Sequence, residues 1–175
     1  MGLIFLTGFM GCGKTTMGKK LSAALGYSFL DLDHVFEAKT GTTIAEYFSS
    51  HGEEAFRKLE SAILKQTEYP ENAVVSTGGG LPCFFDNMEW MNAHGQSVYM
   101  KFTPKMLASR LENAKTPRPV LQGKKGAELV AFIESKLAER DPFYSKASVI
   151  AESFVDLTPE KLIQHLGIEK RGEQI

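Results

Sequence analysis

The sequence predicts an α/β fold in which a parallel sheet of five strands is flanked by helices. Two observations carry this prediction. Short apolar runs alternate with helical stretches along the chain, which is the order expected of a parallel sheet covered by helices. A glycine-rich run, Gly8–Thr15, stands between the first apolar run and the first helical stretch. At 175 residues, 43% of them apolar, the chain suits a single domain over 1–168, followed by a frayed tail over 169–175.

The strands are predicted as apolar runs at five places, and three of them read as short buried strands of a parallel sheet. They are 2–7, 28–32, 72–76, 97–102 and 147–151. No repeat or linker separates them, so nothing in the sequence indicates a second domain.

Helices are predicted from apolar stripes and from their caps. Met17, Leu21 and Leu25 form a stripe that predicts a helix over 15–25, with Gly26 as its C-cap. Residues Thr43 to Glu46 have the form of a capping box that begins another helix.

Three further helices are each predicted from one sequence feature, either an apolar face or a Thr-Pro start. Residues 53–66 place Phe56 and Ile63 on one helical face. Threonine followed by proline marks the start of two more helices, at 103–104 and at 158–159, and Gly167 is expected to end the last one.

The run from Gly8 to Thr15 spells G-x-x-x-x-G-K-[ST], the phosphate-binding P-loop, between a strand and a helix. Its glycines let backbone N–H groups turn towards phosphate oxygens, and the helix N-terminus adds a positive dipole end. We expect Lys14 to reach the phosphates and the Thr15 hydroxyl to bind Mg²⁺. The residues expected around ATP here are Gly11, Cys12, Gly13, Lys14, Thr15 and Thr16.

A carboxylate that helps to hold Mg²⁺ is expected at the end of a neighbouring strand. The run 72–76 ends in Ser76 and Thr77 with no acid, whereas 28–32 runs into Asp31 and Asp33. On an extended segment these two carboxylates would face the same side. Asp31 and Asp33 are therefore well placed to bind Mg²⁺ or a substrate hydroxyl. The alternative interpretation is that they form a turn and cap a helix.

Three other features each allow two interpretations. The triple glycine 78–80 is either a close approach of backbone to a ligand or a tight turn. Arg57 and Arg140 have acidic neighbours and either bind an anion or form surface ion pairs. Residues 115–126 hold two prolines, two glycines, four basic residues and no acid, which fits a solvated loop or a mobile lid, about 112–126, that closes on a triphosphate.

Overall composition excludes several classes of function. The net charge of −1 gives no indication of nucleic acid or an anionic membrane as partner. No apolar run approaches the ~20 residues that span a bilayer, and the N-terminus lacks the basic region of a signal peptide. We therefore expect a cytoplasmic protein. Cys12 and Cys83 form no metal pattern and are expected to be free thiols.

Taken together, these motifs resemble shikimate kinase. Asp31-Leu32-Asp33, then Phe56-Arg57-Lys58-Leu59-Glu60, then the triple glycine follow that family's pattern in order, and Arg118-Pro119 and Arg140 with Tyr144 complete it. The resemblance covers residues 2 to about 150. It implies a P-loop kinase fold and transfer of the ATP γ-phosphoryl group to the 3-hydroxyl of shikimate, with Mg²⁺ as cofactor and a monomer as the working unit.

The resemblance also implies roles for individual residues. Asp33 matches the residue at the accepting hydroxyl and Asp31 the one near Mg²⁺. Lys14, Asp33 and Arg118 are the expected catalytic residues, and Arg118 matches the lid arginine that reaches the phosphates. Arg110 matches a residue near the adenine of ATP. The remaining shikimate contacts match Arg57, Arg140, Gly78, Gly79, Gly80, Phe48, Phe56 and Pro119.

Two departures from the family pattern stand out. Val120 replaces the usual leucine after the lid's Arg-Pro, which should matter little, and Glu152-Ser153-Phe154 offers no arginine at the adenine end. A gluconate kinase would share the P-loop but not the two arginines with a triple glycine in this order. A GTPase switch would need N-K-x-D, and none of the asparagines at 72, 87, 92 and 113 begins one.

Overall fold

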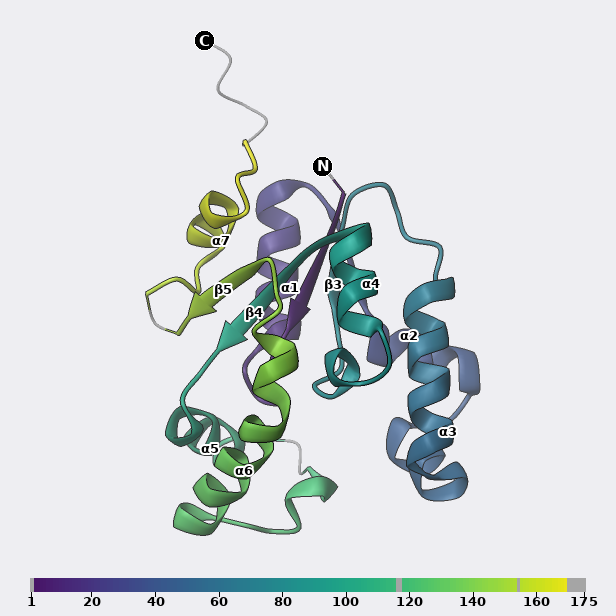
Figure 1. The fold of residues 1–175 in the computed structure, drawn as a ribbon, viewed down its shortest axis with the longest axis vertical. Helices are drawn as coiled ribbons and strands as arrows, with labels where there is room; N and C mark the ends of the chain where they lie inside the picture. The colour runs from purple at the N-terminus through teal and green to yellow at the C-terminus, as the bar shows by residue number, and fades with distance from the viewer. Residues whose placement is uncertain (1, 116–117, 154, 170–175) are drawn as a thin grey trace.

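Five strands form one parallel sheet in the order β2-β3-β1-β4-β5 (Figure 1). The computed structural model describes residues 2–115, 118–153 and 155–169. The strands are β1 (Leu3–Thr7), β2 (Ser28–Asp31), β3 (Ala73–Ser76), β4 (Gly95–Lys101) and β5 (Val149–Glu152). The prediction of a five-stranded parallel sheet flanked by helices is confirmed.

Helices cover both faces of the sheet. Helices α1 (Lys14–Leu25) and α7 (Pro159–His165) pack on one face, and α3 (Ile44–Gln66) and α4 (Asn87–His94) pack on the other (Figure 1). Each face of the sheet has its own hydrophobic core, and the central strand β1 contributes side chains to both. Ile4 and Leu6 pack in the core under α1 and α7, and Phe5 packs in the core under α3 and α4. This division follows from the strand itself, because successive side chains point to opposite faces of a sheet.

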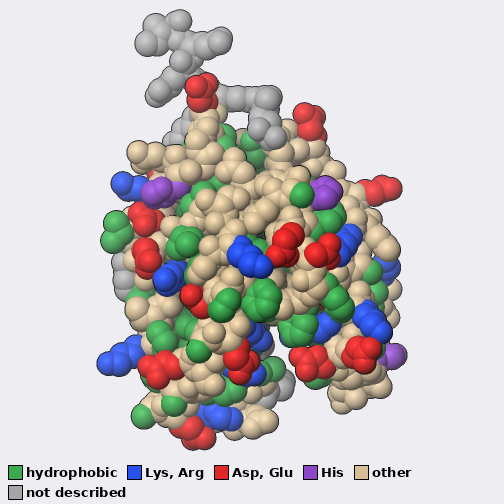
Figure 2. Space-filling view, viewed as in Figure 1, with side chains coloured by type: hydrophobic (Ala, Val, Ile, Leu, Met, Phe, Trp, Pro, Cys, Tyr) green, Lys and Arg blue, Asp and Glu red, His purple; other side chains and the backbone are tan. Residues whose placement is uncertain are grey.

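The remaining elements extend beyond the carboxyl ends of the strands. Helix α2 (Leu32–Thr40) packs against α3, and α5 (Pro104–Glu112) packs against α6 (Gly126–Tyr144). Two 3₁₀ turns, η1 (Leu81–Cys83) and η2 (Pro119–Leu121), complete the described elements. The α2–α3 pair and the α5–α6 pair stand on opposite sides, and the surface is hollowed between them (Figures 1 and 2). Open α/β sheets bind their ligands at this end, outside the strand carboxyl termini.

The predicted caps are present. Gly26 closes α1 with φ 69°, and Thr43 forms a complete capping box with Glu46, whose carboxylate accepts from the Thr43 N–H at 3.0 Å. Thr103 and Thr158 accept from the backbone N–H groups of Met106 and Lys161. The last helix ends at His165, and Gly167 follows with φ 65°. Every strand boundary lies within two residues of the one predicted.

One prediction about helix α3 is modified. The capping box at Thr43 and the stripe over 53–66 belong to one element, which is broken at Gly52 with φ 82° and ψ 171°. This left-handed conformation costs a residue with a Cβ atom but not glycine. The break separates the half of α3 that carries Phe48 from the half that carries Phe56 and Arg57.

Within the described residues, no helix is both long and apolar enough to cross a membrane. The surface in Figure 2 carries acidic and basic side chains intermixed. The predicted C-terminal tail lies outside the described residues from 170 onwards, as do residues 116–117 of the predicted lid.

Candidate active site

The phosphate loop follows β1 and leads directly into α1. Gly13, with φ 90°, is the residue before the helix, and Gly11 has φ 81°. Neither position would take a Cβ atom easily. At Gly13 that atom would lie 2.9 Å from Nη2 of Arg110, and at Gly11 it would lie 2.8 Å from Cδ2 of Leu111. The glycines of the motif are therefore required both by backbone conformation and by close packing against α5.

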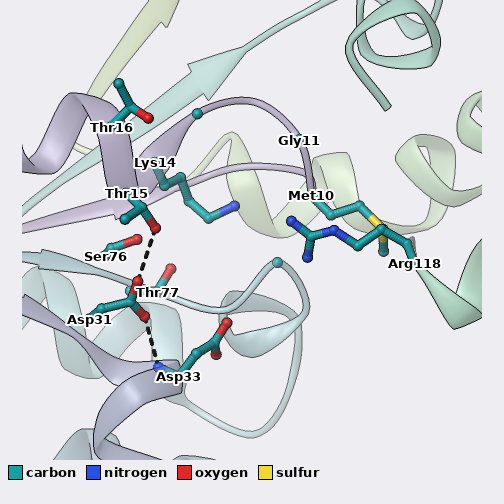
Figure 3. Close-up of a pocket in the computed structure, with 12 residues that line it drawn as sticks. Met10, Gly11, Lys14, Thr15, Thr16, Asp31, Asp33, Ser76, Thr77 and Arg118 are labelled. Carbon is teal, nitrogen blue, oxygen red and sulfur yellow. Dashed lines mark hydrogen bonds between the residues drawn. The ribbon is translucent and has the colours of Figure 1, made fainter. Parts of the chain in front are cut away.

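A cavity of about 250 Å³ opens at this loop. Figure 3 shows Lys14 and Arg118 reaching into it from opposite sides, with Asp31 and Asp33 on a third side. It is lined by Met10, Gly11, Gly13, Lys14, Thr15, Thr16, Asp31, Asp33, Ser76, Thr77, Gly79 and Arg118. The cavity thus joins the P-loop, the two aspartates, Arg118 and the glycine segment, which are far apart in the sequence.

The two aspartates do not lie on an extended segment, so that part of the prediction is wrong. Strand β2 ends at Asp31, and Asp33 is already in the first turn of α2. The physical reason is capping: Oδ1 of Asp31 accepts from the Asp33 N–H at 3.0 Å, and this bond starts the helix. Oδ2 of Asp31 accepts from the Thr15 hydroxyl at 2.9 Å (Figure 3). Asp31 is therefore a helix cap and a pocket residue at once.

The charge on Asp33 is set by competing neighbours. Burial raises the pKa of its carboxyl group above the ordinary value, and the nearby Asp31 raises it further, while Lys14 and Arg118 act in the opposite direction. Asp33 is also close to the glycine segment, because a Cβ atom on Gly78 would lie 3.3 Å from its Oδ1. The carboxylate thus stands between the phosphate loop and the segment expected to bind the acceptor.

The Lys14 ammonium group is held by its own loop. It donates to the carbonyl of Gly8 at 2.8 Å and to that of Phe9 at 3.2 Å. These bonds keep the positive charge at the mouth of the loop, where the helix dipole of α1 also points. Cys12 is buried and is not among the residues that line the cavity.

The second half of the site is built around the triple glycine, which follows β3. A Cβ atom on Gly80 would lie 2.6 Å from both Nη atoms of Arg57, and one on Gly79 would lie 3.6 Å from Nη1 of Arg140. The two guanidinium groups therefore pack directly on glycine backbone. Among the described residues, Nε of Arg57 and Nη1 of Arg140 are buried without a hydrogen-bond partner. Buried donors of this kind are normally satisfied, which points to a missing acceptor.

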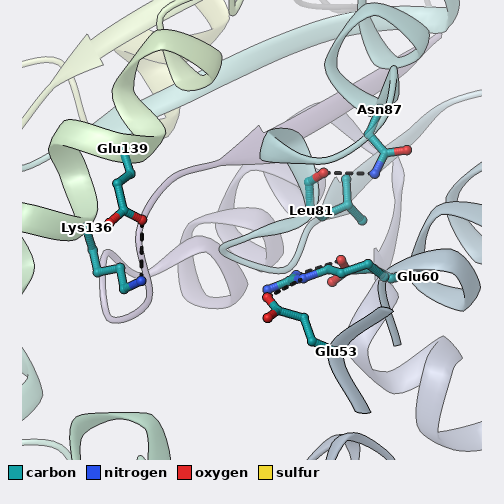
Figure 4. Close-up of polar contacts among 7 residues, drawn as sticks. Glu53, Glu60, Leu81, Asn87, Lys136 and Glu139 are labelled. Atoms are coloured by element: carbon teal, nitrogen blue, oxygen red, sulfur yellow. Dashed lines mark hydrogen bonds and ion pairs between the residues drawn. The ribbon is translucent and has the colours of Figure 1, made fainter. Parts of the chain in front are cut away.

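Arg57 is oriented from several sides. Its Nη1 donates to Oε1 of Glu60 at 2.8 Å, and its Nε lies 3.8 Å from Oε1 of Glu53. Figure 4 labels the two glutamates. The rings of Phe56 and Phe84 lie 5.0 and 4.2 Å from the guanidinium carbon. Such cation–π contacts and a buried ion pair hold a guanidinium group in one orientation.

Glu60 is nearly buried, with 9% of its side chain exposed. Burial raises the pKa of this carboxyl group to about 7, against the opposing effect of the neighbouring Arg57. Desolvation of the carboxylate therefore outweighs the ion pair.

Of the other predicted site residues, some line the cavity and others do not. Arg118 lines the cavity, whereas Arg110 lies over the outside of the phosphate loop, where its Nε donates to the Gly11 carbonyl at 2.7 Å. Phe48 is 40% exposed and its ring lies 5.5 Å from that of Phe56. The predicted contact of the Pro119 side chain lies outside what the structure describes, and so does Phe154.

A family model described as shikimate kinase matches residues 10–169 of the chain. The chain belongs to the shikimate kinase family. The resemblance drawn from the motifs is thereby confirmed. A curated shikimate kinase from Parabacteroides distasonis is 49% identical over 158 residues, which is 90% of this chain and 91% of that protein.

Solved structures of family members are similar to this one throughout. A shikimate kinase from Bacteroides thetaiotaomicron has a TM-score of 0.89 at 42% identity, over 95% of this chain and 99% of that one. A shikimate kinase from Acinetobacter baumannii, solved in complex with shikimate, has a TM-score of 0.80 at 34% identity, over 94% and 89%. The P-loop kinase fold expected for this family member is therefore confirmed.

Sequence reasoning gave no role to two residues that shape the site. Phe84 packs on Arg57, and the Tyr144 hydroxyl donates to the Gly79 carbonyl. No sequence pattern indicated a site role for Phe84, because it follows a short 3₁₀ turn and belongs to no periodic element. A pattern did exist for Tyr144, since it lies four residues after Arg140 and shares its helical face. In the described part of the chain, no three His, Cys, Asp or Glu side chains cluster as a metal site, and both cysteines are free thiols.

Proposed function

We propose that this chain transfers the γ-phosphoryl group of ATP to the 3-hydroxyl of shikimate. Membership of the shikimate kinase family supports this activity. The observation that carries the site assignment is a pair of guanidinium groups, each with an unpartnered buried N–H, packed on a glycine segment beside the P-loop cavity. A nucleotide-binding module without an acceptor would have no use for that second half.

The carboxylate of the acceptor would bind between Arg57 and Arg140. A carboxylate satisfies guanidinium N–H groups in pairs, and it would supply the acceptor that Arg57 Nε and Arg140 Nη1 lack. The fixed orientation of Arg57, held by Glu60 and by two aromatic rings, lowers the entropy cost of binding. Gly78, Gly79 and Gly80 would then present backbone to the ring, with Phe48, Phe56 and Pro119 as its apolar wall.

Asp33 would orient the attacking hydroxyl and accept its proton. Its oxygen lies at the glycine segment on one side and faces the phosphate cavity on the other, which suits a group between acceptor and donor. In the transfer, the hydroxyl oxygen forms a bond to the γ-phosphorus while the bond from that phosphorus to the β–γ bridging oxygen breaks. ADP leaves, and the hydroxyl proton passes to Asp33.

The phosphates would be held by the loop from Gly11 to Thr16 and by two cations. Lys14 and Arg118 reach into the cavity from opposite sides (Figure 3). Charge that develops on the transferring group would be stabilised by both side chains, since both line the cavity. Arg110, which covers the outside of the loop, would support the nucleotide on its adenine side.

Mg²⁺ fits the donors present. The Thr15 hydroxyl and the Asp31 carboxylate lie 2.9 Å apart in a hydrogen bond at the cavity wall, and hard oxygen donors of this kind suit Mg²⁺ together with phosphate oxygens. We propose that these two side chains hold the ion in the nucleotide complex. When bound, the ion would neutralise phosphate charge.

A coupled assay of ADP release tests the proposed function. The chain is incubated with ATP and Mg²⁺ and with shikimate, gluconate or no acceptor, and a Lys14→Ala variant reports contaminating activity. We expect ADP release that depends on shikimate and is lost in the variant. Release that ignores shikimate, or that follows gluconate instead, would reject the acceptor assignment.

A further inference from the structure

We infer that Tyr144 is a positioning residue that fixes the Gly78–Gly80 segment for the acceptor. The inference rests on the proposed function and deepens it, since it names a side chain outside the cavity that sets the geometry of the acceptor half. The observation behind it is a hydrogen bond from the Tyr144 hydroxyl to the carbonyl of Gly79.

The Tyr144 side chain is fully buried at the end of α6. A buried tyrosine needs a partner for its hydroxyl group, and here that partner is a backbone carbonyl of the acceptor segment. Burial raises the pKa of Tyr144, so the hydroxyl stays a donor at working pH. Its ring is supported by that of Tyr99, with the centroids 5.0 Å apart.

A segment of three glycines has no side chains of its own to hold it, so its position depends on contacts from neighbours. A second contact lies just beyond it: the buried Asn87 donates to the Leu81 carbonyl at 2.9 Å (Figure 4). Asn87 is itself fixed by the Ser61 hydroxyl, which donates to its Oδ1 at 2.6 Å. The segment is thus held from α4 behind Gly80 and from α6 at Gly79.

The contact from α6, unlike the one from α4, links the glycine segment to an arginine of the acceptor site. Arg140 lies one helical turn before Tyr144, so the same face of α6 carries a guanidinium group and the hydroxyl that anchors Gly79. Gly80 in turn packs on Arg57. A shift of the segment by a few tenths of an ångström would therefore change the spacing between both arginines and the backbone that a carboxylate must meet.

The test compares Tyr144→Phe with Tyr99→Phe. Both variants remove one hydroxyl from the same buried ring pair, but the Tyr99 hydroxyl donates to Oδ1 of Asp141 at 3.2 Å and does not touch the segment. We expect Tyr144→Phe to raise KM for shikimate about tenfold, the effect of one lost hydrogen bond, with KM for ATP within about twofold of the unmodified chain. Tyr99→Phe should leave both constants within about twofold.

A second readout needs no substrate. The N–H groups of Leu81 and Cys83 donate to the carbonyls of Gly78 and Gly80, so their hydrogen exchange reports the order of the segment. We expect about tenfold faster exchange of these amides in Tyr144→Phe but not in Tyr99→Phe. Exchange would report on the anchor even for a chain that failed the acceptor assay, which separates this inference from the proposed function.

Two results would overturn the inference. One is unchanged exchange at Leu81 and Cys83 in Tyr144→Phe. The other is an equal rise in KM for shikimate in both variants, because a general loss of packing would affect them alike.

Discussion

Replacing Glu60 with glutamine should change how the stability of the protein depends on pH. Glu60 is buried beside Arg57, and burial raises its pKa from the ordinary 4.5 to about 7. Asp33 on α2 also raises this pKa, while Arg57 on α3 and Arg140 on α6 lower it. Between the two values the folded state binds a proton that the unfolded state has lost. Stability therefore falls as pH rises through this window.

The size of the effect follows from the two pKa values. At about 1.4 kcal/mol per pKa unit, ionising Glu60 in the folded protein costs about 3 kcal/mol between pH 4.5 and pH 8. Glutamine keeps the acceptor oxygen for Arg57 and cannot ionise. The free energy of unfolding of the unmodified chain, minus that of Glu60→Gln, should fall by about 3 kcal/mol across that range.

Urea unfolding at a series of pH values measures this difference, and Glu54→Gln is the matched control. Glu54 lies on the same helix, is exposed and pairs with Lys58, whose hydrogen bond lowers its pKa. Its small contribution is present above its unfolded pKa and is lost as pH falls, which is the opposite sign. If the difference for Glu60→Gln stays flat or rises with pH, the ion pair with Arg57 outweighs burial and the reasoning is refuted.

Two further substitutions address the two halves of the site. Asp33→Asn should lower kcat by about 10²- to 10⁴-fold in the ADP-release assay and leave KM for ATP within about twofold; an equal loss of ATP binding would contradict the assigned role. Gly80→Ala should raise KM for shikimate at least about tenfold, because the added Cβ would lie 2.6 Å from both Nη atoms of Arg57, and we expect the same of Arg57→Ala. Unchanged binding of shikimate by calorimetry in either variant would remove Arg57 from the acceptor site.

Local signals in the sequence determined much of the fold. The alternation of apolar runs with capped helices predicted five parallel strands, and Thr43, Thr103 and Thr158 marked helix starts correctly. These signals are reliable because a cap or an apolar stripe acts within one or two turns of chain. The break at Gly52 was not predicted, and the start of α2 at Leu32, with Asp31 as its N-cap, matches only the alternative interpretation of helix-capping aspartates. In the second case one carboxylate served the strand end and the helix start together.

The sequence by itself determined which groups the site contains: the P-loop spelling, the two aspartates, the triple glycine and the arginines. The tertiary structure decided how they act on one another. The packing of Phe84 on Arg57 and the bond from Tyr144 to Gly79 join residues that are 27 and 65 positions apart in the sequence, and the burial of Glu60 depends on the surrounding core. A sequence pattern reports neighbours along the chain, whereas desolvation and hydrogen-bond partners depend on what the folded chain brings alongside.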